Sequence, residues 1–205
     1  MKQRRSGGRT LLWSVLMSSP GPLILGVGLI FGRSSTQIAD FVRRSSELLA
    51  IIMSFAVFRL TTKDGYTDTA KKEKLERLTN IFVGAMMCLG GGIMLVLAFA
   101  SEEGEKGNVI PGLCIAVLGV VANTVFWRRY TALNKKEPNS ILAVQARLYR
   151  AKSLVDACVT LALGSVAVFP GSEFSAWLDM IGSAVVAVYL IWCGIKTVWE
   201  KTGKK

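Results

Sequence analysis

The most constraining feature of this chain is a series of apolar stretches that are longer than the core helices of a soluble domain need to be. Spanning a hydrocarbon core of about 30 Å takes roughly 20 residues of helix. The 205-residue sequence is 51% hydrophobic and 19% charged, which leaves little of it for a soluble domain. The pattern predicts an all-α, polytopic membrane protein in which residues 1–205 form one transmembrane domain. The six predicted transmembrane helices cover about 10–32, 36–60, 79–100, 109–127, 140–168 and 174–197.

Basic residues concentrate on one side of the predicted membrane. The outer loops contain only Arg33 and Lys106. This positive-inside distribution places both termini in the cytoplasm. It also explains the net charge of +11 without a nucleic-acid partner. With the amino terminus inside, 18 of the 25 basic residues fall in the four inner segments: Lys2, Arg4, Arg5, Arg9, Arg59, Lys63, Lys71, Lys72, Lys74, Arg77, Arg128, Arg129, Lys135, Lys136, Lys196, Lys201, Lys204 and Lys205.

The remaining composition narrows the class of protein. The first apolar run begins like a signal peptide but continues past Pro20 and Pro22 to Phe31, so we interpret it as a retained helix that is kinked at its prolines. Compact size and short loops favour a bacterial inner (plasma) membrane.

The four cysteines fall singly in four helices, which is typical of small packing residues. With no histidine and no phosphate loop, we expect neither an enzyme nor a cofactor.

Two of the predicted helices carry ionisable residues inside otherwise apolar segments. Such residues are costly in a bilayer and often mark transport pathways. Helical spacing places three of them on one face of the second helix and three polar residues on one face of the fifth. These candidate ion-site or substrate-site residues are Asp40, Arg43, Glu47, Tyr149, Ser153 and Asp156.

The two clusters can meet if the second and fifth helices are antiparallel neighbours. Glu47 then comes level with Ser153, and Arg43 with Asp156. One interpretation is an internal ion-pair network, because unpaired buried charges cost several kcal/mol. The other is a substrate or proton site in which Glu47 or Asp156 changes its protonation state. The sequence leaves both open.

The spacing of these residues resembles that of the cation diffusion facilitator family, the proton-coupled exporters of zinc, manganese and iron. The family's second helix carries a pattern like A-D-x-x-H-S-x-x-D, and this chain reads A-D-F-V-R-R-S-S-E from Ala39 to Glu47. Aligned from Ser140, the fifth helix places Tyr149 and Ser153 at the family's His and Asp positions. Weaker matches, which include Asn123, extend the resemblance over most of residues 20–198. It implies six helices and a homodimer.

The chain departs from the family at the positions of the metal ligands. Those positions hold Arg43, Glu47, Tyr149 and Ser153. Arginine has no acceptor with which to ligate a metal, and borderline metals favour imidazole or thiolate. The resemblance therefore implies a rewritten, non-zinc site, with the Arg43 guanidinium between Glu47 and Asp156 as a built-in cation. Because the sequence stops at Lys205, the family's cytosolic metal-binding domain is not expected.

Two functions remain open at this point. The chain is a transporter that moves another cation, a proton-coupled solute or an anion, or it is a non-transporting structural or accessory membrane protein that keeps the scaffold. The expected partners are the lipid bilayer, a second copy of the chain and a small ion or solute.

Overall fold

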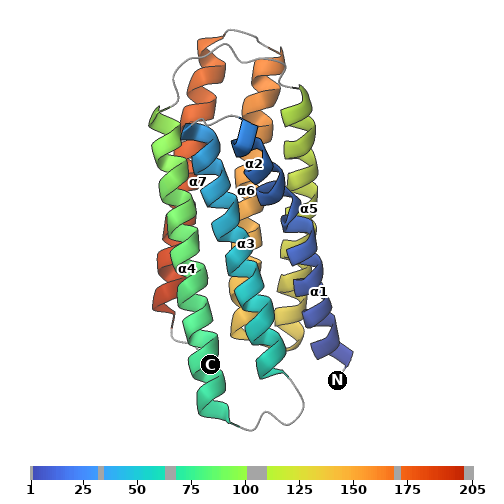
Figure 1. Cartoon of the computed structure of the whole chain (residues 1–205). Helices are drawn as coiled ribbons and strands as arrows, with labels where there is room; N and C mark the ends of the chain where they lie inside the picture. Colours follow the sequence, from blue (N-terminus) through green and yellow to red (C-terminus); the bar gives the residue numbers. More distant parts are fainter. Residues whose placement is uncertain (1, 32–34, 63–67, 101–109, 169–171, 201–205) are drawn as a thin grey trace.

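The computed structural model describes residues 2–31, 35–62, 68–100, 110–168 and 172–200, and every regular element in them is an α-helix. The helices run side by side as a bundle, and both ends of the described chain lie at its lower end (Figure 1). The elements are α1 Lys2–Ser18, α2 Pro20–Phe31, α3 Ser35–Thr61, α4 Thr69–Ala100, α5 Ile110–Lys136, α6 Ser140–Val168 and α7 Glu173–Trp199.

The first predicted helix is divided into α1 and α2 at the expected place. α1 ends at Ser18 and α2 begins at Pro20. Proline fits the first turn of a helix, where its missing N–H would have no partner, but it removes a donor from the interior of a continuous helix. The predicted kink at the prolines is therefore confirmed.

Two helices extend beyond the membrane spans that the sequence predicts. α4 begins at Thr69, ahead of the span that starts near residue 79, and α5 continues to Lys136, past the span that ends near residue 127. The Asp68 carboxylate accepts a hydrogen bond from the backbone N–H of Lys71 at 2.9 Å and caps α4. The apolar pattern predicts only the membrane-spanning part of each helix, and charged residues continue both helices beyond it.

α6 begins at Ser140 as predicted, but its cap is a different residue. The side-chain oxygen of Asn139 accepts hydrogen bonds from the backbone N–H groups of Ile141 and Leu142, at 3.0 and 3.3 Å. Ser140 instead donates to the carboxylate of Glu76 on α4 at 2.6 Å. The Ser140 hydroxyl is therefore engaged by a tertiary contact with Glu76, and Asn139 caps the helix.

Glycines allow α4 and α7 to approach closely. A Cβ atom on Gly91 would lie 2.8 Å from the backbone oxygen of Ala187, and one on Gly194 would lie 2.6 Å from the backbone oxygen of Gly84. Small residues at such crossings let membrane helices pack backbone against backbone. α5 packs along α6 in a second close pair, and α3 packs against α4.

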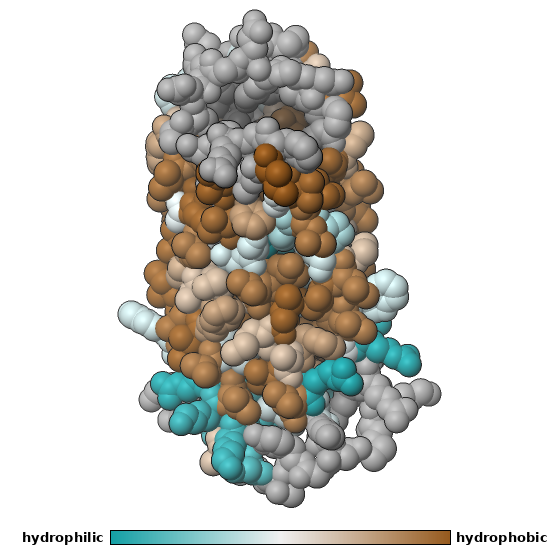
Figure 2. Space-filling model, viewed as in Figure 1, coloured by the Kyte–Doolittle hydropathy of each residue, from teal (hydrophilic) through white to brown (hydrophobic). Residues whose placement is uncertain are grey.

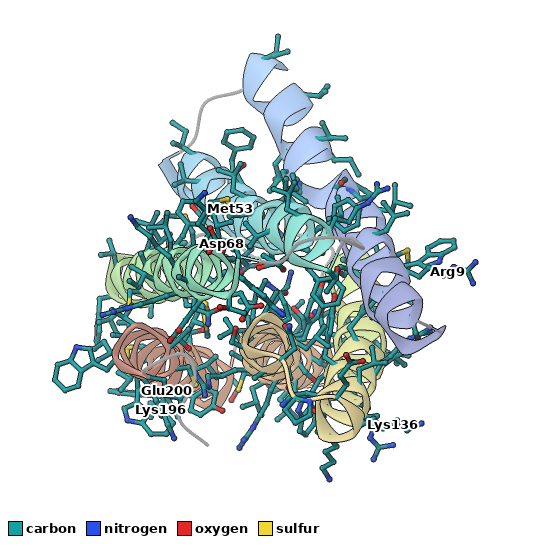
Figure 3. The ribbon with its side chains drawn as sticks, turned by 90° about the horizontal axis from the view of Figure 1, so that it is seen from below. Arg9, Met53, Asp68, Lys136, Lys196 and Glu200 are labelled. Carbon is teal, nitrogen blue, oxygen red and sulfur yellow. The ribbon has the colours of Figure 1, made fainter. Side chains whose placement is uncertain are left out.

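The surface of the bundle is apolar around its middle. Large hydrophobic side chains point outward, among them Ile24, Leu118 and Val185, each more than 60% exposed. Figure 2 shows a broad apolar band with hydrophilic residues gathered at the lower end. There, Arg9, Lys136 and Lys196 project outward around the rim (Figure 3).

Within the described residues, four helices are long and apolar enough to cross a membrane by length and composition. Together with the apolar surface, these helices make the chain an integral membrane protein. α3 and α6 are of similar length, but they carry the two charged clusters. The four candidate spans are Ser6–Val27, Thr69–Phe99, Leu113–Lys136 and Met180–Trp199.

Candidate functional site

Glu47 lies at the centre of the buried charge cluster between α3 and α6. Its side chain is 9% exposed, and each carboxylate oxygen has its own cation. Oε1 is 3.1 Å from Nη1 of Arg43, four residues earlier on α3, and Oε2 is 3.1 Å from Nζ of Lys152 on α6. One negative charge therefore faces two positive charges inside the bundle.

The antiparallel register of α3 and α6 brings these residues together. Seven residues later on α3 and seven earlier on α6, Nε2 of Gln145 donates a hydrogen bond to Oγ of Ser54 at 2.8 Å. Seven residues are about two helical turns, so the same faces of both helices meet again. The two contacts place Glu47 level with Lys152, the neighbour of Ser153 in the sequence.

Lys152 is held by an aromatic ring as well as by Glu47. Its Nζ lies 5.4 Å from the centroid of the Tyr149 ring, within the range of a cation–π interaction. The hydroxyl of Tyr149 faces α1, where it lies 3.3 Å from Oγ of Ser18. Tyr149 is 1% exposed, so the ring forms an inner wall of the cluster.

Asp156 and Ser153 make their contacts with α5. Asp156 accepts a hydrogen bond from Nδ2 of Asn123 at 2.6 Å. Oγ of Ser153 lies 2.6 Å from Oγ1 of Thr124. Gly119 leaves room for the carboxylate, because a Cβ at that position would lie 2.5 Å from Oδ2 of Asp156.

The structure therefore divides the predicted site residues into two groups. Arg43 and Glu47 form the predicted pair, but the ion pair that joins α3 to α6 comes from Lys152, which sequence reasoning did not assign to the site. Asp156 accepts a hydrogen bond from Asn123 on α5. The predicted register of the two helices could have identified Lys152, because Lys152 is next in the sequence to Ser153, the residue expected beside Glu47. The side chain of Asp40 lies outside the described residues.

The donor set does not fit a tetrahedral metal site. Among the described residues, no three His, Cys, Asp or Glu side chains lie close enough together to hold a metal ion. The positions that the family pattern assigns to ligands hold a guanidinium, a carboxylate, a phenol and a hydroxyl. Only the carboxylate of Glu47 is a good ligand, and two cations already neutralise it.

A bundle of membrane helices with ionisable side chains gathered in its interior is typical of membrane transport proteins. The chain belongs to the cation efflux family, because the family's cation efflux transmembrane domain matches residues 11–203. The resemblance found in the dispersed motifs is thereby confirmed. No curated protein matches the chain significantly.

Proposed function

We propose that this protein is a cation-efflux-like transporter whose central site holds fixed protein cations in place of a bound divalent metal. The observation that carries the proposal is the double ion pair of Glu47 with Arg43 and Lys152, at 3.1 Å each. These residues occupy or adjoin the positions where the family pattern has metal ligands. The family membership supports cation transport in general.

The charges of the cluster disfavour a divalent substrate. At an effective dielectric constant of about 20, two unit charges roughly 4 Å apart interact by about 4 kcal/mol. Counting Glu47, Arg43 and Lys152 alone, a divalent ion at that distance from each would gain about 8 kcal/mol and lose about 16 kcal/mol. Asp156, which acts electrostatically on Lys152, would offset part of this repulsion. A monovalent cation or a proton meets half of this net repulsion. It can also take the place of one of the protein cations that pair with Glu47.

We also propose six transmembrane spans, cytoplasmic termini, a bacterial inner-membrane location and a homodimer. In this arrangement α3 and α6 cross the membrane within the bundle, because their charges pair with each other and with α5 rather than facing lipid. The basic rim at the lower end, where both described chain ends lie, supports a cytoplasmic orientation of that end.

Flux measurements in proteoliposomes test the function. We expect uptake of a monovalent cation or of protons that Glu47→Gln abolishes, and zinc or manganese flux no greater than in empty liposomes. Glu73→Gln, at an exposed carboxylate of α4, is the matched control and should leave flux unchanged. Zinc flux that depends on Glu47 would refute the non-zinc site.

If the well-folded wild-type protein shows no flux of any tested ion, the result would instead favour the accessory function. The observation behind that second candidate is that both oxygens of Glu47 are already engaged by protein cations, as in a structural ion-pair network.

A further inference from the structure

The two cations that neutralise Glu47 are not equivalent. Arg43 belongs to the same helix as Glu47, one turn away, so the pair stays together when α3 moves. Lys152 reaches Glu47 from α6. Its compact ammonium stands on a flexible four-carbon stem with rotatable donors, whereas a guanidinium is a planar fork. Lys152 is therefore the cation that can leave the carboxylate without a rearrangement of α3.

The surroundings of the Lys152 ammonium have the features of a small cation site. A carboxylate oxygen lies 3.1 Å from Nζ, and the ring of Tyr149 lies 5.4 Å from it at the centroid. The side chains of Lys152 and Glu47 are 15% and 9% exposed. An aromatic face attracts an ammonium group, and a carboxylate accepts charge-assisted hydrogen bonds from its N–H donors.

We propose that Glu47 and Tyr149 form a binding site for a small monovalent cation of the primary ammonium type, and that Lys152 is its tethered resident ligand. The inference rests on the proposed function only in taking this cluster as the central site. An incoming monovalent cation that replaces the ammonium keeps the charge of the cluster unchanged, whereas a divalent ion adds one positive charge.

This arrangement also links occupancy of the site to the contact between helices. While Lys152 occupies the site, its stem joins α6 to α3. When a free cation takes its place, that link is lost and the Gln145–Ser54 hydrogen bond, two turns away, remains. Binding thereby loosens one end of the α3–α6 contact and leaves the other in place.

Chemical rescue of Lys152→Ala tests the proposal. The substitution removes the ammonium and its stem, and we expect a lower melting temperature in detergent. Ethylammonium chloride at ~1–100 mM, the concentration range of a weak site, should restore much of the lost melting temperature, and the effect should level off at high concentration. The wild-type protein should gain little, because its own ammonium occupies the site. Tetramethylammonium chloride, which has the same charge and no N–H donors, should restore less at equal ionic strength.

Two further variants make the result specific. Lys152→Ala combined with Glu47→Gln should lose the rescue, and Lys152→Ala combined with Tyr149→Leu should weaken it. Equal shifts in wild type and Lys152→Ala, or no shift in Lys152→Ala, would overturn the proposal. If Lys152→Ala aggregates, purification with ethylammonium should raise the yield of its monodisperse peak above that with tetramethylammonium, and equal yields would also overturn it.

The rescue and the flux assays fail independently. Rescue reports binding at the cluster in a protein that need not transport. A wild-type protein that transports cations while its Lys152→Ala variant shows no rescue would reject the tethered ligand and leave the proposed function intact. The reverse outcome would reject transport and keep the site.

Discussion

Replacing Glu47 by glutamine should destabilise the protein more than replacing either of its cations. The substitution keeps the size of the side chain but removes the charge with which both Arg43 and Lys152 form ion pairs. Their side chains are 13% and 15% exposed, so water screens them weakly. Breaking a buried ion pair by removing one partner costs about 3–5 kcal/mol. At about 2–4 °C per kcal/mol for a chain of this length, the melting temperature should fall by about 6–20 °C.

Lys152→Met offers the informative comparison, because it leaves Glu47 paired with Arg43. We expect the free energy of unfolding to fall by a smaller amount, about 1–3 kcal/mol. This is the usual cost of leaving a buried polar group without one of its hydrogen-bond partners. The double variant Glu47→Gln/Lys152→Met should lose less than the sum of the two single variants, because each single variant already breaks the Glu47–Lys152 pair.

The measurement is thermal or denaturant unfolding of each variant in the same detergent, with Glu73→Gln as the exposed control. Equal losses for Glu47→Gln and Lys152→Met would refute the idea that Glu47 holds both cations. Strict additivity in the double variant would show that Glu47 and Lys152 do not interact in solution.

Two glycine substitutions test the close approaches, and each has a matched control with open space around its Cβ. Gly91→Ala places a methyl group 2.8 Å from a backbone oxygen of α7, so it should lower the melting temperature, whereas Gly92→Ala, with nothing within 4 Å, should not. Gly119→Ala places a methyl group 2.5 Å from Oδ2 of Asp156 and should displace that carboxylate from α5, at about 1–3 kcal/mol, while Gly164→Ala should be neutral. Equal melting temperatures within either pair would contradict the packing described for that glycine.

The sequence predicted the helices well wherever apolar length and backbone chemistry decide the outcome. The break near Pro20 and the start of α6 at Ser140 follow from missing N–H donors and from the onset of an apolar segment. The apolar pattern marks only the membrane-spanning parts of α4 and α5, and charged residues continue both helices beyond them. A local rule also cannot foresee that Glu76, distant in the sequence, binds the Ser140 hydroxyl at the start of α6.

The sequence predicted where the site lies but not which side chains contact one another there. Intramembrane charge on two helices indicated the residues involved, and the antiparallel register placed Glu47 beside the turn that contains Ser153. Which cation crosses to Glu47 depends on the direction of each side chain and on the reach of its stem. Lys152 lies next to the expected position and its stem reaches Glu47, while Asp156 turns to Asn123 on α5.

The sequence by itself therefore determined that this chain is a helical membrane protein and that two of its otherwise apolar helices carry charge. Those properties follow from composition, periodicity and residue type, which act locally along the chain. Only the tertiary structure decided that Lys152 joins α3 to α6 and that Glu47 is paired twice. Ion pairing inside the bundle depends on distances between helices and on competition among partners, and both exist only once the helices have packed.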